Sequence, residues 1–127
     1  LERKEVAPHV AEEVLDRLES AGVVDDAAYA ATLARTRFAE KGAARKAIAE
    51  ELRRKGLGEE HIRSALGQIG FDDEADAALA LARKKLAATR GLDPLVRRRR
   101  ALAMLGRKGY SHEVAMRAIE QALAGPD

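Results

Sequence analysis

The 127 residues include 46% apolar, 35% charged and 3% aromatic side chains, three prolines and no cysteine. This composition excludes disulfides, thiol catalysis and thiolate metal sites, and no apolar run approaches the ~18 residues that a membrane span requires. Alanine, the best helix former, accounts for 27 residues, so we expect an all-α protein with a thin core and no sheet.

The formal net charge of +2 hides a segregation along the chain. Residues 1–26 carry a net charge of −5 and residues 71–76 carry −4, whereas residues 27–70 carry +4 and residues 77–127 carry +7. Basic residues collected in the later segments favour a polyanionic partner. The alternative is that these charges only solvate the outer faces of helices.

Internal repeats give the domain organisation. The segments Leu1–Ala7, Leu52–Gly58 and Leu105–Ser111 align without a gap, and apolar residues follow each of them at helical spacing. A second alignment, offset by 48, pairs Arg35 with Arg83 and Leu33 with Leu81. These alignments predict tandem three-helix units, stacked in an elongated, curved array.

The repeats predict three units in chain order. We expect residues 1–24 to be the remnant of a first repeat, comprising the end of its second helix and its third helix, in a chain that starts within a structural unit. The second unit is residues 25–71, with helices at 26–40, 43–55 and 59–69. The third unit is residues 72–127, with helices at 73–90, 94–108 and 111–124. Its connection at 87–94 holds about five extra residues, which a loop between helices tolerates well.

Turn and capping residues support these helices. Gly56 and Gly109 follow the second helix of each unit, where a left-handed residue is favoured. Acidic pairs and Ser111 supply hydrogen-bond acceptors or negative charge at helix starts. Tyr29 and Phe38 have the spacing of core residues, and we expect Tyr110 to pack against its turn rather than to form an exposed contact.

Basic residues recur in four matched columns of the second helices. The pairs are Arg45 with Arg98, Lys46 with Arg99, Arg54 with Arg107, and Lys55 with Lys108. Cations in a last helical turn complement the helix dipole by ~0.3–1 kcal/mol each, which accounts for the last two pairs. The dipole does not account for the four arginines of residues 97–100, which lie near the opposite end of their helix. A binding partner would account for them.

Three motifs carry a resemblance to a known family. They are Gly22–Ala30 (GVVDDAAYA), with Tyr29 in its aromatic position, Glu51–Leu57 (ELRRKGL) and Arg107–Ser111 (RKGYS). Their order and spacing over nearly the whole chain resemble RecX, the bacterial regulatory protein of the RecA recombinase. RecX-like proteins consist of three such units.

The resemblance implies a regulator that binds the RecA filament on single-stranded DNA and inhibits its recombinase, ATPase and coprotease activities, in DNA repair, homologous recombination and the SOS response. Family members lie along the filament groove and reach protein and DNA with a basic surface. On this chain the implied surface comprises Arg45, Lys46, Arg54, Lys55, Arg98, Arg99, Arg107 and Lys108. Whether contacts to RecA or to DNA dominate stays open.

A helix-turn-helix protein that binds duplex DNA is the competing interpretation, since three helices with a glycine-containing turn fit that motif. The third helix of such a protein enters the major groove. Here one third helix opens with Glu59 and Glu60, and the other carries His112 and Glu113, so acidic side chains would meet phosphates. Sequence-specific recognition is therefore disfavoured.

The sequence disfavours an enzyme. His9, His61 and His112 fall in different units and columns, and there is no phosphate-binding glycine loop, HExxH pair or nucleophile elbow. No charged-then-apolar leader opens the chain. We therefore expect a soluble, cytoplasmic, monomeric binding protein without cofactor or bound metal.

Overall fold

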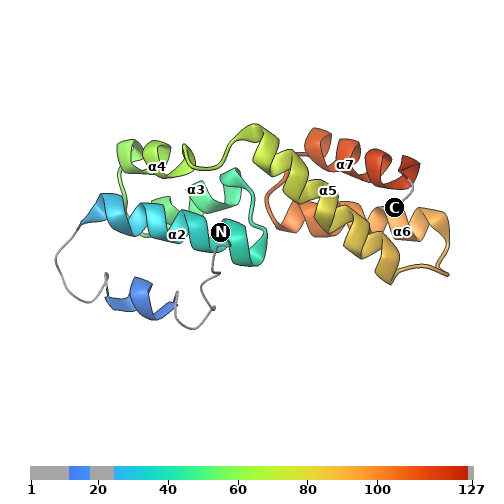
Figure 1. Cartoon of the computed structure of the whole chain (residues 1–127), viewed down its shortest axis with the longest axis horizontal. Helices are drawn as coiled ribbons and strands as arrows, with labels where there is room; N and C mark the ends of the chain where they lie inside the picture. Colours follow the sequence, from blue (N-terminus) through green and yellow to red (C-terminus); the bar gives the residue numbers. More distant parts are fainter. Residues whose placement is uncertain (1–11, 18–24, 126–127) are drawn as a thin grey trace, which may run out of the picture.

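The computed structural model describes residues 12–17 and 25–125, and all regular secondary structure within these ranges is helical. Residues 12–17 form a short helical segment, and most of the predicted remnant, residues 1–24, lies outside the described residues. The helices that follow are α2 Asp26–Lys41, α3 Arg45–Arg54, α4 Glu59–Leu66, α5 Phe71–Ala88, α6 Pro94–Arg107 and α7 His112–Ala124 (Figure 1). The all-α prediction is confirmed, and no predicted end of these helices is wrong by more than three residues.

The helix starts follow from local sequence. The side chains of Asp25 and Ser111 accept hydrogen bonds from backbone amides in the first turns of α2 and α7, at 3.1 and 3.2 Å. Pro94 occupies the first turn of α6, where its missing N–H costs nothing. Helix α5 starts two residues before its predicted start, because the Asp73 carboxylate accepts from the Gly70 amide at 2.8 Å and closes the first turn.

The two three-helix units are repeats of one arrangement. Helices α2, α3 and α4 correspond in order to α5, α6 and α7, and in both units the first helix packs most extensively against the third. Figure 1 shows the two units side by side along the longest axis, with α4 and α7 on the same edge. The predicted tandem array of three-helix units is therefore confirmed for the part of the chain that the structure describes.

Each unit has its own core, and the two cores differ in bulk. The first contains the large buried side chains Leu33, Ile48, Leu52 and Ile62. Six of the ten buried residues of the second are alanine, and its bulk comes from Leu86, Leu105, Tyr110 and Ile119. One of those alanines, Ala44, belongs to the second unit, residues 25–71, so the core formed by α5, α6 and α7 is completed by the α2–α3 connection of the neighbouring unit.

The α2–α3 connection packs directly on the α6–α7 turn. The Ala44 amide donates to the Lys108 carbonyl at 2.8 Å, and the Tyr110 hydroxyl donates to the Gly42 carbonyl at 3.0 Å. Burial raises the pKa of Tyr110 to about 12, with Glu74 adding to the effect. The predicted turn-packing role of Tyr110 is confirmed, and we call this set of contacts the inter-unit junction.

Gly109 sits where the inter-unit junction leaves no room for a side chain. Its φ is +99°, and a Cβ added there would lie 2.7 Å from the Cβ of Ala47 in α3. Gly56, at the matched position after α3, has a φ of +87° and open space around it. Both glycines have the left-handed backbone conformation that the sequence predicts. Only at Gly109 does close packing between the units also exclude a side chain.

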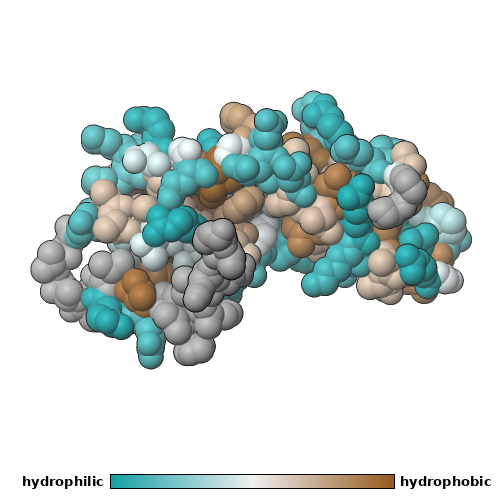
Figure 2. All heavy atoms as spheres, viewed as in Figure 1, coloured by the Kyte–Doolittle hydropathy of each residue, from teal (hydrophilic) through white to brown (hydrophobic). Residues whose placement is uncertain are grey.

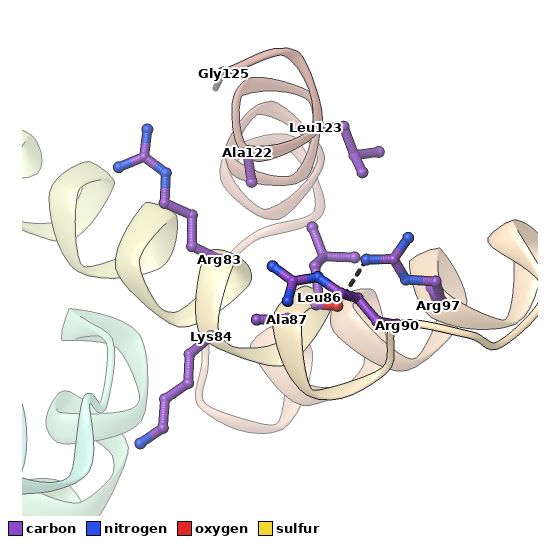
Figure 3. Close-up of a pocket in the computed structure, with 9 residues that line it drawn as sticks. All are labelled: Arg83, Lys84, Leu86, Ala87, Arg90, Arg97, Ala122, Leu123 and Gly125. Atoms are coloured by element: carbon purple, nitrogen blue, oxygen red, sulfur yellow. Dashed lines mark hydrogen bonds between the residues drawn. The ribbon is translucent and has the colours of Figure 1, made fainter. Parts of the chain in front are cut away.

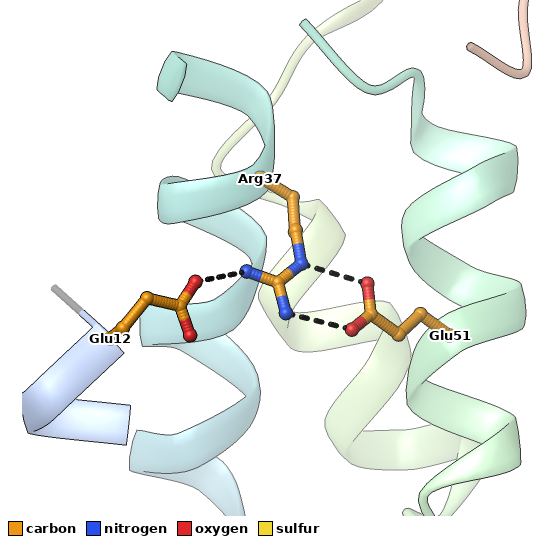
Figure 4. Close-up of polar contacts among 3 residues, drawn as sticks. All are labelled: Glu12, Arg37 and Glu51. Carbon is orange, nitrogen blue, oxygen red and sulfur yellow. Dashed lines mark hydrogen bonds and ion pairs between the residues drawn. The ribbon is translucent and has the colours of Figure 1, made fainter. Parts of the chain in front are cut away.

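A two-sided ion pair ties the first helical segment to α2 and α3. The Arg37 guanidinium donates to both oxygens of Glu51 at 2.9 Å and to Glu12 at 3.1 Å (Figure 4). The Arg37 and Glu51 side chains are 17% and 21% exposed, so solvent screens this pair only in part. Hydrogen bonding from Arg37 lowers the pKa of Glu51, which outweighs the opposing effect of burial.

Replacing Gly109 by alanine is expected to destabilise the protein by about 1–3 kcal/mol more than replacing Gly56 by alanine. Both substitutions force alanine into a left-handed conformation, but only Gly109→Ala also drives a methyl group into α3. Urea unfolding followed by circular dichroism measures the difference. Equal losses of stability would mean that the inter-unit junction is not closely packed at this position.

Replacing Glu51 by glutamine is expected to cost about 1–2 kcal/mol at neutral pH, since hydrogen bonds to charged groups are worth roughly 1.5–3 kcal/mol and the glutamine retains part of them. The folded-state pKa of Glu51 lies below its unfolded value of ~4.3, so the contribution is present above that value and is lost as the pH falls through the lowered pKa. The stability gap between wild type and Glu51→Gln should therefore narrow in acid. In an Arg37→Gln background the stability gap should no longer narrow in acid. If it still narrows there, the lowered pKa of Glu51 is not caused by Arg37.

Candidate partner-binding surface

The eight predicted surface residues lie at the two ends of α3 and α6, in matched positions. Each helix carries one pair of basic residues at or near its first turn and a second pair at its last turn or just beyond it. The structure divides the eight into side chains that have partners within the chain and side chains that face solvent. The second group is the candidate surface.

Arg45 is a structural residue of the connection between the units. Its guanidinium donates to the carbonyls of Leu66, the last residue of α4, and of Ile69 just after it, and it lies 4.7 Å above the centre of the Phe71 ring. Its backbone amide donates to the Glu74 carboxylate at 2.6 Å. Arg45 therefore fixes the path of the chain from α4 into α5, and its side chain is committed to that role.

Arg98 and Lys108 also have partners within the chain. The Arg98 guanidinium pairs with the Glu120 carboxylate on α7. The Lys108 ammonium donates to the Lys41 carbonyl at 2.6 Å, which adds a contact to the inter-unit junction. These two cations and Arg45 carry intramolecular contacts that the matched columns did not predict.

The other five side chains are exposed, and they make no hydrogen bond or ion pair within residues 12–17 and 25–125. They are Lys46, Arg54, Lys55, Arg99 and Arg107. We call them the exposed basic set. Lys46 and Arg54 are eight residues apart on α3, about 12 Å along its axis, and Arg99 and Arg107 repeat that spacing on α6.

Helix geometry places the exposed basic set away from the two cores. The buried residues of α3 are Ile48, Ala49 and Leu52; at 100° per residue Lys46 lies about 140° around the helix from the midpoint of Ile48 and Leu52, and about 60° from Ala49. On α6 the buried residues Ala101 and Leu105 hold the same relation to Arg99. Since α3 and α6 hold equivalent places in the two units, the two helices present their cations in the same pattern.

The four-arginine run of residues 97–100 has a mixed explanation. Arg97 donates to the Leu86 carbonyl at 2.6 Å and Arg98 pairs with Glu120, so half of the run stabilises the third unit. Arg99 and Arg100 are exposed. The helix dipole accounts for none of these four arginines, and only the two exposed ones call for a binding partner.

Aromatic side chains contribute little to the exposed surface. Tyr29 and Phe38 pack against the first core and Tyr110 is buried, as predicted. Phe71 is 76% exposed beneath Arg45, a role that sequence reasoning missed. Hydrophilic side chains cover most of the face seen in Figure 2, where apolar ones appear in small separate areas. Contacts made by this face would be mainly polar.

The described residues hold no cluster of three or more histidine, cysteine or acidic residues able to bind a metal ion. His61 is partly exposed on α4 and His112 is exposed at the start of α7, while His9 lies outside the described residues. Within the described ranges, none of the helices has the length and apolar character needed to cross a lipid bilayer.

The helix openings relevant to the helix-turn-helix interpretation are acidic and exposed. Glu59 and Glu60 open α4, and Glu59 pairs with Arg53 at 2.7 Å. Glu113 lies in the first turn of α7 and pairs with Arg117 at 3.0 Å. In both units the third helix therefore presents carboxylates at the end that would enter a DNA groove.

A second basic site was missed by sequence reasoning. Arg83, Lys84, Arg90 and Arg97 line a pocket of about 460 Å³ between α5, the start of α6 and the end of α7 (Figure 3). These residues come from two helices and a connection. Most of them have no basic counterpart in the second unit, so the alignment of the repeats does not predict them. The only signal available was a basic residue, Arg90, within the extra residues of the α5–α6 connection.

Comparisons with known proteins agree with this architecture. Residues 25–66 match the second three-helix domain of RecX, and residues 72–119 match the third three-helix domain of RecX. The two matches cover α2 to α4 and most of α5 to α7.

Curated relatives match over nearly the whole chain. The regulatory protein RecX of Streptomyces coelicolor is 43% identical over 97% of this chain and 65% of its own length, and that of Thermobifida fusca is 42% identical over 97% and 66%. The RecX of Amycolatopsis mediterranei is 35% identical over 97% of this chain and 70% of its own. The chain thus spans about two thirds of the length of these relatives.

A solved structure shares the fold. The crystal structure of a regulatory protein RecX superposes with a TM-score of 0.68 at 30% sequence identity, over 92% of this chain and 57% of that one. The repeated three-helix units, the domain matches and the relatives agree, and the chain belongs to the RecX family.

Proposed function

We propose that this chain binds the RecA filament on single-stranded DNA and inhibits its recombinase, ATPase and coprotease activities without catalysing a reaction. Its relatives are named regulatory proteins, which supports a regulatory role. The observation that carries the proposal is the recurrence of exposed, unpaired cations on α3 and α6. Cations repeated in this way are complementary to a partner that repeats its negative charges.

The mechanism is differential binding. Residues 25–71 and 72–127 act as successive units, each offering a pair of long cationic side chains to the filament: Lys46 with Arg54, and Arg99 with Arg107. A ligand that binds one filament conformation more tightly shifts the filament toward it, by no more than the difference in affinity. Inhibition of this kind needs no reacting group on the regulator.

A DNA-binding helix-turn-helix protein is the second candidate, favoured only by the three-helix form of the units. The exposed carboxylates that open α4 and α7 weigh against it, because they would lie against DNA phosphates. A mobility assay with RecA filaments, bare single strands and duplex DNA separates the two. The proposal predicts preference for the filament, whereas retention of a particular duplex by the isolated protein at physiological salt would favour the alternative.

Removing either cation pair is expected to weaken inhibition of RecA strand exchange. At ~0.2–1 kcal/mol for each exposed contact, Lys46→Ala with Arg54→Ala should raise the half-inhibiting concentration about 2- to 30-fold. Arg99→Ala with Arg107→Ala should act similarly, and the variant with all four substitutions should weaken inhibition further than either pair alone.

The matched control is Arg63→Ala with Arg117→Ala, which removes two exposed cations from the third helices. It should leave inhibition nearly unchanged, and circular dichroism should show the same helicity in all variants. If the control weakens inhibition as much as the α3 and α6 variants do, only net charge matters and the exposed basic set is not the binding surface.

A further inference from the structure

We propose that the pocket between α5, α6 and α7 binds a phosphate group. Its volume of about 460 Å³ falls in the range of small-molecule sites, ~300–1,000 Å³. The lining residues are Arg83, Lys84, Leu86, Ala87, Arg90, Arg97, Ala122, Leu123 and Gly125. Within the part of the chain that the structure describes, no carboxylate is among these lining residues, so the charged side chains that an entering anion meets there are all cations.

Three arginines approach this pocket from different elements. Arg83 comes from α5, Arg90 from the α5–α6 connection and Arg97 from the first turn of α6. In Figure 3 the guanidinium groups of Arg90 and Arg97 lie beside Leu86, Arg83 extends on the side of α7, and Lys84 points away from the others. The planar donors of Arg90 and Arg97 thus lie on either side of Leu86 in this view, and Arg83 adds a further cation to the lining toward the end of α7.

Helix dipoles explain only part of this charge. The C-terminal ends of α5 and α7 meet at the pocket, and each carries about half a negative elementary charge, so together they balance roughly one cation. The end of α5 is also covered by Thr89, whose hydroxyl donates to the Lys85 carbonyl at 3.0 Å. The three arginines therefore leave an excess of about two positive charges.

Arg97 is held in place before any ligand arrives. Its Nη2 donates to the Leu86 carbonyl at 2.6 Å and its Nε to the Thr89 hydroxyl at 3.5 Å, so three of its five N–H donors stay available to a ligand. A guanidinium fixed in this way loses less side-chain entropy on binding an anion than a freely rotating one.

The arginine lining is a feature of the third unit alone. At the positions of the second unit that correspond to Arg90 and Arg97 stand Gly42 and Ala44, both part of the inter-unit junction. Only Arg83 has a basic counterpart, Arg35, and that side chain donates to Gln68 at 2.8 Å. Arg97 contributes to the fold through its hydrogen bond to Leu86, but Arg83 and Arg90 have no such bond within the described residues, and the three-helix arrangement of the second unit forms without a counterpart of Arg90 or Arg97.

The aliphatic part of the lining narrows the ligand. Leu123 is 43% exposed beside Ala122, and this surface suits a sugar or the edge of a base next to the phosphate. The phosphate can belong to a free nucleotide or to a single strand of DNA. The inference goes beyond the proposed function, because the binding is a property of the isolated protein and does not require RecA.

The test is a titration of the isotope-labelled 127-residue protein with pyrophosphate, adenosine monophosphate and a short oligothymidylate, followed through the methyl resonances of Ala122 and Leu123. Pyrophosphate and the monophosphate are expected to shift both resonances. Arg83→Gln with Arg90→Gln should weaken the affinity about tenfold or more, because it removes two charge-assisted contacts, whereas the control Arg63→Gln with Arg117→Gln should change it less than about twofold.

The outcomes separate the sources of the phosphate. Competition between oligothymidylate and pyrophosphate at the same methyl groups identifies strand phosphates as ligands, and binding of only the small phosphates identifies a free nucleotide; either supports the pocket. Arg83→Lys with Arg90→Lys, which keeps the charges, should restore part of the affinity. Unshifted methyl resonances, equal losses in the pocket and control variants, or binding of polyglutamate but not of phosphates would overturn the proposal. The titration measures phosphate binding and not inhibition of strand exchange. Phosphate binding could therefore be confirmed even if the proposed function proved wrong.

Discussion

The inter-unit junction is the contact on which the rest of the structure depends. Two short three-helix units, one with an alanine-rich core, do not hold a fixed orientation relative to each other unless specific contacts join them. The α2–α3 connection supplies it by completing the second core with Ala44 and by accepting the Tyr110 hydroxyl at Gly42. Arg45 and Glu74 fix the return path of the chain on the other side of the connection. Backbone hydrogen bonds, a buried ring and a charged contact thus act on the same few residues.

A fixed orientation of the two units lets their repeated cations bind one partner together. Exposed lysines and arginines each contribute little to binding in water, because solvent screens them and their side chains lose entropy on contact. When two units hold their pairs at a constant spacing, the second contact forms at a high effective concentration once the first is made. Modest contacts then add up to a useful affinity for a long, repeating partner.

Sequence reasoning succeeded where local pattern determines structure. Helix ends at Gly56 and Gly109, caps at Asp25 and Ser111, and the buried stripe of α3 follow from periodicity and turn chemistry. The matched columns also identified which helix of each unit is basic. These features depend on residues within a few positions of one another or on repetition of the whole unit.

Sequence reasoning failed where a side chain's role depends on a distant neighbour. Arg45 and Arg98 share a column, yet Arg45 donates to carbonyls at the end of α4 and just after it, whereas Arg98 pairs with Glu120. Helical spacing predicts neither partner. The arginine pocket joins three elements and is absent from the second unit, so an alignment of repeats could not reveal it. The ion pairs of Arg37 reach 25 residues back and 14 forward in the chain, and only packing brings them together.

The most direct test of the central claim is the distance between the two units in solution. The chain has no cysteine, so spin labels on Lys46→Cys and Arg99→Cys report on α3 and α6 without further substitutions. Pulsed electron resonance should give one narrow distance distribution, which broadens when Gly109 is replaced by valine. A broad distribution in the unaltered background, or one that the valine leaves narrow, would show that the inter-unit junction does not hold the units in a fixed relation.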